Sequence, residues 1–333
     1  MSEYNYQGKK ILIIGGTGTI GNHLVRRILE DEPNVIRVFS RDEHKQYEMR
    51  NELQAYSQKL RYLIGDVRDQ KRLSRAMEGI DYVFHLAAMK HVPSCEYNPF
   101  EAVQTNVIGT QNVIQAALEN NVTKVLFTST DKAISPTNTY GATKLTAERL
   151  ISAAEYQKGS KITVFSSVRF GNVMGSRGSV IPLFKNQIIE KKEITITDPD
   201  MLRYMMTPSQ AIDLILQSNE KARGGEVFVL KMPVIRIGDL AEVLIEEVTN
   251  SHKIDEQVAI RVIGLRPGEK RYEEIMTNDE VLVAEETDNM YVIPPFFSKS
   301  ENSDNLSSIP EIDMKPISKR VIRDWLKSES LMK

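Results

Sequence analysis

The sequence lacks several features that would place it in a specialised class. Its 333 residues include one cysteine, Cys95, so no disulfide can form within the chain, and this favours a reducing compartment. No apolar run approaches the ~18–20 residues that a membrane helix needs. The first residues are polar and do not form the apolar core of a signal peptide. These absences predict a cytoplasmic protein with no membrane insertion.

An excess of charge of one sign is also missing. Lysine and arginine number 43 against 45 aspartates and glutamates, and the net charge is −2. Such a chain has no overall field that would attract nucleic acid or an anionic membrane, so neither is an expected partner. An anionic ligand must therefore be held by a local site. The 41% of apolar residues suffices for a large core, and the length favours about two domains or one elaborated domain.

The first half of the chain repeats one pattern, a short β-branched run followed by a turn and a stretch of helical periodicity. The runs that predict strands are Ile11–Ile14, Val35–Phe39, Leu60–Ile64, Tyr82–Leu86, Val125–Thr128 and Thr163–Phe170. The stretches that predict helices are Ile20–Glu30, Asp42–Tyr56, Gln70–Met77, Phe100–Glu119 and Tyr140–Gln157. Parallel strands need crossovers and bury both faces, so the alternation predicts an α/β fold with a Rossmann-type, doubly wound parallel sheet. Ligands bind such sheets at the carboxyl ends of the strands.

The pattern changes after about Gly171. Segments that contain proline, such as the one at Pro182, alternate there with helices predicted at Ser209–Ala222 and Ile237–Val248. We expect one domain mainly over residues 1–170 and a smaller cap mainly over 171–297, with a chain that can recross between them. Residues 298–333 form a variable tail, for which an oligomer contact, a lid and a merely variable end are all open. Its last predicted helix, Ser318–Lys327, carries Trp325 as a packing anchor.

A glycine-rich turn follows the first predicted strand directly. Glycines allow a tight turn, and they let backbone N–H groups approach a pyrophosphate at the start of the next helix. The spacing alone is a weak signal, but the strand before it and the helix after it are both predicted here. The residues expected to bind the dinucleotide at this turn are Gly15, Thr17, Gly18, Thr19, Ile20 and Gly21.

The residues after the second strand bear on the choice between NADP and NAD. An NAD-selective site usually presents a carboxylate to the ribose 2′-hydroxyl. This chain offers Ser40 and Arg41 there, with Lys45 nearby, and these favour a 2′-phosphate and hence NADP, while Asp42 leaves NAD open. Asp66 and Val67 at the end of the third strand are further expected cofactor contacts, and Asp66 either accepts from the adenine amino group or caps the following helix. The domain over residues 1–170 is thus expected to be mainly NADP-binding, and the cap over 171–297 mainly substrate-binding.

The most specific constellation follows the fifth strand. Thr130, Asp131 and Lys132 stand at its end, and Tyr140 with Lys144 has the spacing of one helical turn, which puts both side chains on one face. We expect the ammonium of Lys144 to lower the pKa of the Tyr140 phenol, so that Tyr140 can act as a base near neutral pH. Lys144 can also hold the nicotinamide ribose. A solvated surface ion pair is the alternative interpretation of Asp131 and Lys132.

At this point the chain resembles the extended short-chain dehydrogenase/reductase superfamily over roughly residues 8–295. The segments that carry the resemblance are the glycine turn, Asp66-Val67, His85–Ala88, Asn98-Pro99, Thr105–Thr110, Tyr140-x-x-x-Lys144 and Arg169–Val173. Within the superfamily, Ser129–Ala133, Tyr140–Lys144 and Gly175–Pro182 are similar to the nucleotide-sugar 4,6-dehydratases, in particular the inverting UDP-N-acetylglucosamine 4,6-dehydratases of pseudaminic acid synthesis.

The resemblance implies a lyase that removes water from UDP-N-acetylglucosamine. Tyr140 would take the C4 hydroxyl proton while NADP accepts the hydride, and Thr130 would hydrogen-bond the same oxygen. Lys132 is expected to remove the C5 proton, and Asp131 to protonate the departing C6 hydroxyl. The stored hydride then returns to C6, and protonation of C5 from the opposite face inverts that centre.

The resemblance also implies further binding residues and an assembly. The additional cofactor contacts would be Ala87, Ala88, Lys90 and Val173, besides Tyr140 and Lys144. The sugar nucleotide would be bound by Lys90, Asn172, Arg177, Arg203, Arg266 and Glu269, and arginine suits a diphosphate through bidentate bonds. Dimers or hexamers are the expected homo-oligomers. No metal-ligand pattern is present in the sequence, so no metal is expected.

Three other functions remain open at this stage. A C5-retaining 4,6-dehydratase and a nucleotide-sugar 4-epimerase would use the same cofactor site. The third is a non-catalytic, NADP-binding regulatory protein, against which the intact Thr130, Asp131, Lys132, Tyr140 and Lys144 argue.

Overall fold

The computed structural model describes residues 6–265, 268–270, 272–295 and 314–332. Contacts divide the chain into two compact units, and each unit is built from three separate segments. The first unit comprises Met1–Phe170, Ile212–Leu230 and Ile275–Ile309; the second comprises Gly171–Ala211, Lys231–Glu274 and Pro310–Lys333. Among the described helices, none combines the length and the hydrophobicity that crossing a lipid bilayer requires.

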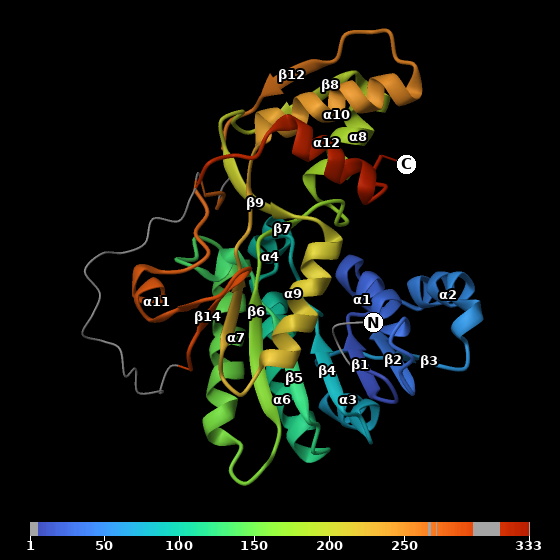
Figure 1. The fold of residues 1–333 in the computed structure, drawn as a ribbon, viewed down its shortest axis with the longest axis vertical. Coiled ribbons are helices and arrows are strands. Elements are labelled where there is room, and N and C mark those ends of the chain that lie inside the picture. Colours follow the sequence, from blue (N-terminus) through green and yellow to red (C-terminus); the bar gives the residue numbers. More distant parts are fainter. Residues whose placement is uncertain (1–5, 266–267, 271, 296–313, 333) are drawn as a thin grey trace. The chain divides into compact units, whose positions relative to one another are not determined.

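The first unit is organised around a large sheet (Figure 1). In the described residues its strands lie in the order β13-β14-β10-β6-β5-β4-β1-β2-β3. Their bounds are β1 (Lys10–Ile14), β2 (Val35–Ser40), β3 (Leu60–Ile64), β4 (Tyr82–His85), β5 (Lys124–Thr128), β6 (Val164–Arg169), β10 (Val227–Leu230), β13 (Glu285–Glu286) and β14 (Met290–Ile293). The pairings from β10 through to β3 are parallel, and β14 and β13 continue the sheet in antiparallel fashion.

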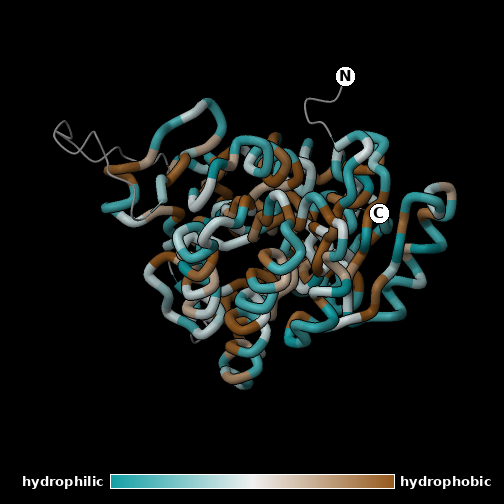
Figure 2. Tube along the Cα trace, turned by 90° about the horizontal axis from the view of Figure 1, so that it is seen from below, coloured by the Kyte–Doolittle hydropathy of each residue, from teal (hydrophilic) through white to brown (hydrophobic). Residues whose placement is uncertain are grey.

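Burial explains why these runs form parallel strands. Residues Ile11–Ile14 of β1 are all inaccessible to solvent, as the centre of a sheet covered on both faces requires. Figure 2 shows hydrophobic segments mostly in the interior of the trace and hydrophilic segments on many of its outer turns. Strand order reverses between β1, which continues to β2, and β4, which continues to β5. This is the switch point at which doubly wound sheets bind ligands.

Helices connect the strands of the first unit. Their bounds are α1 (Thr19–Leu29), α2 (Glu43–Glu52), α3 (Gln70–Met77), α4 (Val92–Tyr97), α5 (Pro99–Ala102), α6 (Gly109–Glu119), α7 (Thr139–Gln157) and α11 (Asn278–Val283), with short 3₁₀ turns at Gln54–Tyr56 and Asp131–Ala133. A π-helical segment, Val103–Ile108, lies between α5 and α6. The single helix predicted over Phe100–Glu119 is therefore wrong in detail, because the hydrogen-bond register changes within it.

The second unit has smaller sheets and its own core. Its strands are β7 (Asn172–Val173), β8 (Glu193–Ile196), β9 (Leu202–Met206), β11 (Val234–Arg236) and β12 (Ala259–Val262). They form the sheets β11-β9-β7 and β12-β8. Its helices are α8 (Val180–Lys191), α10 (Ile237–His252) and α12 (Lys319–Ser328), and α9 (Pro208–Lys221) passes from this unit into the first. Met201 and Met205 lie in the hydrophobic core of this unit.

The structure confirms the α/β fold with a doubly wound parallel sheet. It also contains helix α8, which the sequence analysis did not predict because Pro182 suggested a break. Pro182 lies in the first turn of α8, where a missing N–H costs nothing because that amide has no partner within the helix.

Candidate active site

The glycine turn after β1 forms a close backbone approach. Gly15 has φ +84°, and a methyl group added there would lie 2.8 Å from the backbone nitrogen of Ala87. Helix α1 begins at Thr19 with Gly18 as its N-cap, which has no side chain to occupy the amides of the first turn. The turn is therefore open to an anion that backbone N–H groups could bind, and its residues fit the pyrophosphate of a dinucleotide.

Polar side chains gather at the carboxyl end of β2. The hydroxyls of Thr17 and Ser40 lie 2.8 Å apart and link the glycine turn to this strand end. The Arg41 side chain is 59% exposed, and its Nη1 lies 3.5 Å from a carboxylate oxygen of Asp66. Lys45 forms an ion pair with Asp42 at 2.5 Å. Arg41 is thus largely exposed after the carboxyl end of β2, with Asp66 beside it.

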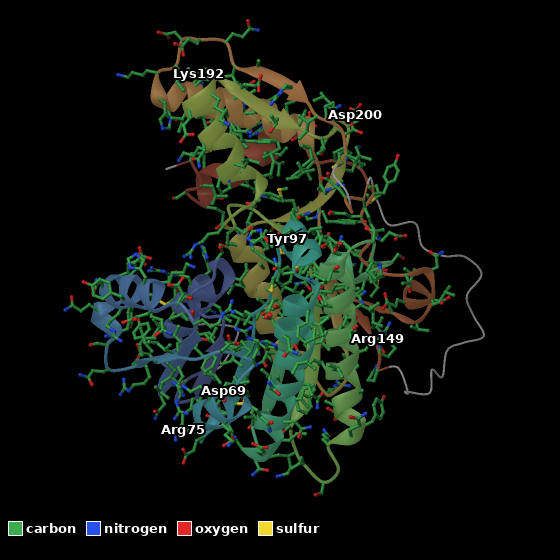
Figure 3. All side chains as sticks on the ribbon, turned by 180° about the vertical axis from the view of Figure 1, so that it is seen from behind. Asp69, Arg75, Tyr97, Arg149, Lys192 and Asp200 are labelled. Carbon is green, nitrogen blue, oxygen red and sulfur yellow. The ribbon has the colours of Figure 1, made fainter. Side chains whose placement is uncertain are left out.

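Asp66 does not act as a helix cap, so that alternative is wrong. Asp69 caps α3 by accepting from the Arg72 N–H (Figure 3 labels Asp69). Asp66 instead accepts several hydrogen bonds from the Arg68 guanidinium. Burial alone would raise the pKa of Asp66, but the Arg68 hydrogen bonds hold it below its ordinary value.

The loop after β4 is held by a residue that the sequence analysis did not assign. Asn106 lies in the π-helical segment, accepts from Met89 N at 2.8 Å and donates to Met89 O at 3.0 Å. Its amide also donates to the Thr143 hydroxyl on α7 at 3.0 Å. Asn106 therefore fixes the loop that contains Ala87, Ala88 and the exposed Lys90. The Thr-Asn pattern that carried the family resemblance was the available signal.

The predicted catalytic residues lie together after β5. Thr130 caps a 3₁₀ turn over Asp131–Ala133, and its hydroxyl donates to Asp131 Oδ1 at 2.7 Å. Lys132 Nζ lies 3.1 Å and 3.2 Å from the two Asp131 carboxylate oxygens. Asp131 is fully buried and Lys132 is 28% exposed, so the pair is not a solvated surface ion pair.

Helix α7 approaches this turn at its first residues. Asn138 caps the helix by accepting from Gly141 N at 2.9 Å. A methyl group at Gly141 would lie 2.1 Å from the carbonyl oxygen of Lys132, so only glycine permits this approach. Tyr140, the preceding residue, is thereby placed beside Thr130, with which its side chain forms a hydrogen bond.

The pKa of Tyr140 differs from the sequence expectation. Burial raises it above its ordinary value, although the Thr130 hydrogen bond and the Lys132 ammonium act in the opposite direction. The net shift is thus opposite to the one expected from Lys144. The ammonium of Lys144 donates to the backbone oxygen of Thr128 at 2.5 Å and lies 3.9 Å from the centre of the Phe127 ring. Burial lowers the pKa of Lys144 to about 7.

A buried charge network contacts α7 at Glu148, near the middle of the helix. Arg169, at the end of β6, donates to Glu148 at 2.6 Å and to Glu280 at 2.9 Å and 3.0 Å. It also donates to the backbone oxygen of Ile275 at 2.9 Å. Glu280 in turn completes the capping box of α11 with Thr277. Three elements of the first unit are thus joined through one guanidinium.

Three predicted substrate residues lie in one cluster of the second unit. Asn172 donates to Glu273 at 3.2 Å and to the backbone oxygen of Tyr204 at 3.0 Å. Arg203 pairs with the same Glu273 at 3.4 Å and with Glu269 at 3.7 Å. The cluster thus joins the ends of β7 and β9 to the segment around residue 270.

Among the other predicted residues of this unit, two are placed by the elements in or beside which they lie. Arg177 is exposed in the loop that precedes α8. Val173 is buried in β7. Arg266 lies outside the described residues.

The described residues contain no group of three or more His, Cys, Asp or Glu side chains that could hold a metal ion. His85 is fully buried, and burial lowers its pKa to about 3, so its ring is neutral. Its Nε2 lies 3.1 Å from the Thr110 hydroxyl.

The fold and this site define a short-chain dehydrogenase/reductase of the extended type. Residues 11–295 match the family described as polysaccharide biosynthesis protein, and the chain belongs to that family.

Three comparisons are informative in more detail. The chain is 54% identical to the X-ray structure of Pen from Bacillus thuringiensis, with a TM-score of 0.91, covering 98% of this chain and 99% of the other. It is 44% identical to an inverting UDP-N-acetylglucosamine 4,6-dehydratase of Campylobacter jejuni, over 92% of this chain and 89% of the relative. It is 46% identical to a UDP-glucose 4-epimerase of Rickettsia rickettsii, over 86% and 83% respectively.

Proposed function

We propose that this chain is an NADP-dependent UDP-N-acetylglucosamine 4,6-dehydratase, a lyase that inverts C5 and acts in the synthesis of nonulosonic acids such as pseudaminic acid or of other surface glycans. One observation carries the proposal. A fully buried Asp131 contacts Lys132 after β5, beside Thr130 and Tyr140. Elimination of water needs both an acid and a base near one sugar ring, and this pair supplies both. The similarity to the Campylobacter dehydratase supports the same reaction.

The cofactor would be held by the glycine turn, Ser40, Arg41 and Lys144. When bound, it accepts a hydride from C4 and returns it to C6. The exposed Arg41 guanidinium favours NADP because it can form charge-assisted bonds with a 2′-phosphate. Lys144, buried next to Tyr140 on α7, would bond a ribose hydroxyl in place of the Thr128 carbonyl.

Tyr140 and Thr130 would act on the C4 hydroxyl. Thr130 donates to or accepts from the sugar oxygen, and Tyr140 takes its proton. Burial raises the pKa of Tyr140, so its phenolate must be stabilised by neighbouring groups when cofactor and substrate are bound. The ammonium of Lys132 and the Thr130 hydrogen bond already favour the phenolate in the free protein.

Asp131 and Lys132 would perform the elimination through a shared proton. Transfer of one proton from the Lys132 ammonium to the Asp131 carboxylate, across 3.1 Å, leaves an amine and a carboxylic acid without exchange with water. The amine then removes the C5 proton, which the C4 ketone has made acidic. The acid protonates the C6 oxygen, and the C6–O bond breaks to release water. A proton from solvent would then reach the opposite face of C5 and give the inverted product, while Tyr140 would release the C4 proton to solvent.

In the second unit, Arg177 is the candidate for the diphosphate. The charge of Arg203 is already offset by Glu269 and Glu273, so its guanidinium is better suited to a neutral sugar or base. Asn172 shares Glu273 and would act in the same part of the site.

The test is the conversion of UDP-N-acetylglucosamine by the purified protein in heavy water, followed by NMR. Inverting dehydration gives a 4-keto-6-deoxy sugar with the L-arabino configuration and deuterium at C5. The same product with retained C5 configuration identifies the retaining dehydratase. Protein that binds NADP and leaves every UDP-sugar unchanged would show a regulatory binding protein instead.

The Rickettsia relative favours a second candidate, a nucleotide-sugar 4-epimerase. Epimerisation needs only oxidation and reduction at C4, so it gives Asp131 and Lys132 no role. A product with C6 oxygen retained and C4 inverted would establish it.

A further inference from the structure

Residues 314–332, here called the C-terminal segment, form an integral part of the second unit. The segment begins beside β9 and β11, where Tyr204 donates its hydroxyl to Met314 Sδ at 2.9 Å and Ile317 N donates to Val234 O at 2.9 Å. It then forms α12, which lies alongside α10 in Figure 1.

Helix α12 is fastened to α10 by apolar and charged contacts. Ile322 and Leu326 are fully buried in the core of the second unit. On the polar side, Arg323 pairs with Glu246 and with Glu247, the latter at 2.8 Å. This combination fixes the position of α12 on its unit and thereby of the residues that follow it.

The residues after α12 reach the loop Gly175–Ser179, which leads into α8. Leu331 N donates to Leu326 O at 3.0 Å, which turns the chain back, and Lys185 Nζ on α8 donates to Met332 O at 3.1 Å. A methyl group added at Gly175 would lie 2.3 Å from Leu331 Cδ2. The Leu331 side chain therefore packs directly against the backbone of Gly175.

The loop has a conformation that depends on such support. Gly175 and Gly178 have φ +68° and +73°, and Arg177 lies between them. Backbone hydrogen bonds in the loop run from Ser176 N to Val173 O at 3.3 Å and from Ser179 N to Ser176 O at 2.9 Å, both of them short-range. Two adjacent glycine turns allow many conformations, so packing from outside the loop selects one.

We propose that the C-terminal segment is a positioning element for the loop Gly175–Ser179, and that Leu331 holds this loop in the conformation that presents Arg177 to the diphosphate of a nucleotide sugar. The role of Arg177 rests on the proposed function, whereas the support of the loop by Leu331 does not. Leu331 would act through the loop and would not touch the substrate itself.

The test uses the full-length protein and four variants: Leu331→Ala, Gly175→Ala, the double variant, and Leu183→Ala as a control. Leu183 is a partly exposed leucine of α8 in the same unit. In Leu331→Ala, the KM for UDP-N-acetylglucosamine should rise about five- to tenfold with kcat within about twofold and NADP affinity unchanged. Gly175→Ala should raise KM because its methyl group collides with Leu331. The double variant should then have a lower KM than Gly175→Ala alone, since the colliding side chain is gone.

Hydrogen exchange of the free protein separates this inference from the proposed function. The amides of residues 175–179 should exchange faster in Leu331→Ala than in wild type or Leu183→Ala, whatever the substrate is. Unchanged exchange and unchanged KM in Leu331→Ala would overturn the inference, even if its melting temperature fell. An inactive wild type would instead remove the proposed function, and faster loop exchange in Leu331→Ala would still support the positioning role.

Discussion

Asp131 and Lys132 differ in their access to solvent although they are neighbours in sequence. The 3₁₀ turn buries the carboxylate completely and leaves the ammonium partly exposed, with the two groups in contact. The two groups are therefore close enough to act on one sugar ring, as the proposed elimination requires. At this scale the structure adds the contact itself, which spacing in the sequence does not reveal.

Replacing Lys132 by alanine should therefore abolish the base. We expect kcat to fall by about 10²–10⁴, the range typical of a general base, with NADP affinity unchanged. Deuterium incorporation at C5 in heavy water should be lost to the same extent. Lys71→Ala, at an exposed position of α3, is the control and should behave as wild type. If Lys132→Ala still incorporated deuterium at C5, a residue other than Lys132 would be the base that removes the C5 proton.

Gly141→Ala tests the close approach of α7 to the 3₁₀ turn. In most helices this change stabilises by roughly 0.5–1 kcal/mol, but here the methyl group would lie 2.1 Å from the Lys132 carbonyl. We expect at least a tenfold loss of kcat, because Tyr140 and Lys132 must separate, together with a lower melting temperature. Gly79→Ala is a suitable comparison, since Gly79 has φ +67° and no neighbour within 4 Å of an added methyl group.

Stability should fall in Gly79→Ala while activity stays intact. Full activity in Gly141→Ala would contradict the assigned geometry.

The chemical identity of the site residues could be predicted from the sequence, but their electrostatics could not. Tyr140 and Lys144 lie one turn apart as their spacing requires. The pKa of Tyr140 is nevertheless raised, because burial outweighs the cations near it and Lys144 bonds the Thr128 carbonyl. Burial and hydrogen-bond partners depend on how β5 and α7 pack, and no local pattern in the sequence records that packing.

At the scale of elements, α7 is the helix on which the proposed chemistry depends. It carries Tyr140 and Lys144 near its start and Glu148 one turn later. Its position is set by Gly141 in its first turn and by the Arg169 network at Glu148, near its middle. Helix α7 was predictable from apolar periodicity over Tyr140–Gln157, and the observed helix is Thr139–Gln157. The π-helical segment was not, since a local change of hydrogen-bond register leaves little trace in a 3.6-residue period.

Lys144 predicts a pH dependence of stability in the free protein. Its pKa is lowered to about 7 by burial, from roughly 10.4 in an unfolded chain. Between these values the unfolded chain binds more protons, so this residue makes stability rise with pH from about 7 to 10. Below pH 7 both states are protonated and the contribution is constant. Lys144→Met should therefore be more stable than wild type at pH 6, with the difference shrinking toward pH 10.

Urea unfolding at pH 6, 8 and 10 measures this dependence. If the free energies of unfolding of wild type and Lys144→Met changed with pH in parallel, the lowered pKa of Lys144 would be contradicted.

The Arg169 network predicts a large effect from a single substitution. Arg169→Met leaves Glu148 and Glu280 buried together without the guanidinium that they share, and breaking such a pair costs about 3–5 kcal/mol. Arg149, labelled in Figure 3, offers a matched control. It pairs with Glu280 only at 3.9 Å and is half-exposed, so Arg149→Met should cost less than about 1 kcal/mol. Chemical denaturation measures the free energy of unfolding of both variants. Equal losses of stability in the two variants would contradict the importance of burial.

At the scale of the whole molecule, each unit has a core of its own. Hydrophobic periodicity predicted the first unit well, because a parallel sheet buried on both faces leaves long apolar runs. The second unit was harder to predict, since its strands are short and pair across long sequence separations, such as β8 with β12. Each unit is assembled from three separate segments of the chain. A single boundary position in the sequence cannot describe such an arrangement.

The net charge of −2 must be reconciled with a proposed cofactor that carries several phosphates. Local potential resolves this, because charges separated by more than about 10 Å are largely screened at physiological salt. Removing the charge of Arg41 should therefore change the affinity for NADP far more than removing one positive charge elsewhere. We expect Arg41→Ser to lower the affinity for NADP at least tenfold and to leave the affinity for NAD within about twofold.

Arg75→Ser makes the same change in net charge on α3, at the position labelled in Figure 3. It should alter neither affinity. Titration of both dinucleotides at low and moderate salt gives the comparison. The advantage of wild type over Arg41→Ser should shrink as salt rises, because the contact is exposed. If both variants lost NADP affinity equally, overall charge and not Arg41 would govern binding. If neither lost it, the 2′-phosphate would not be recognised at the end of β2, and NAD would become the preferred cofactor.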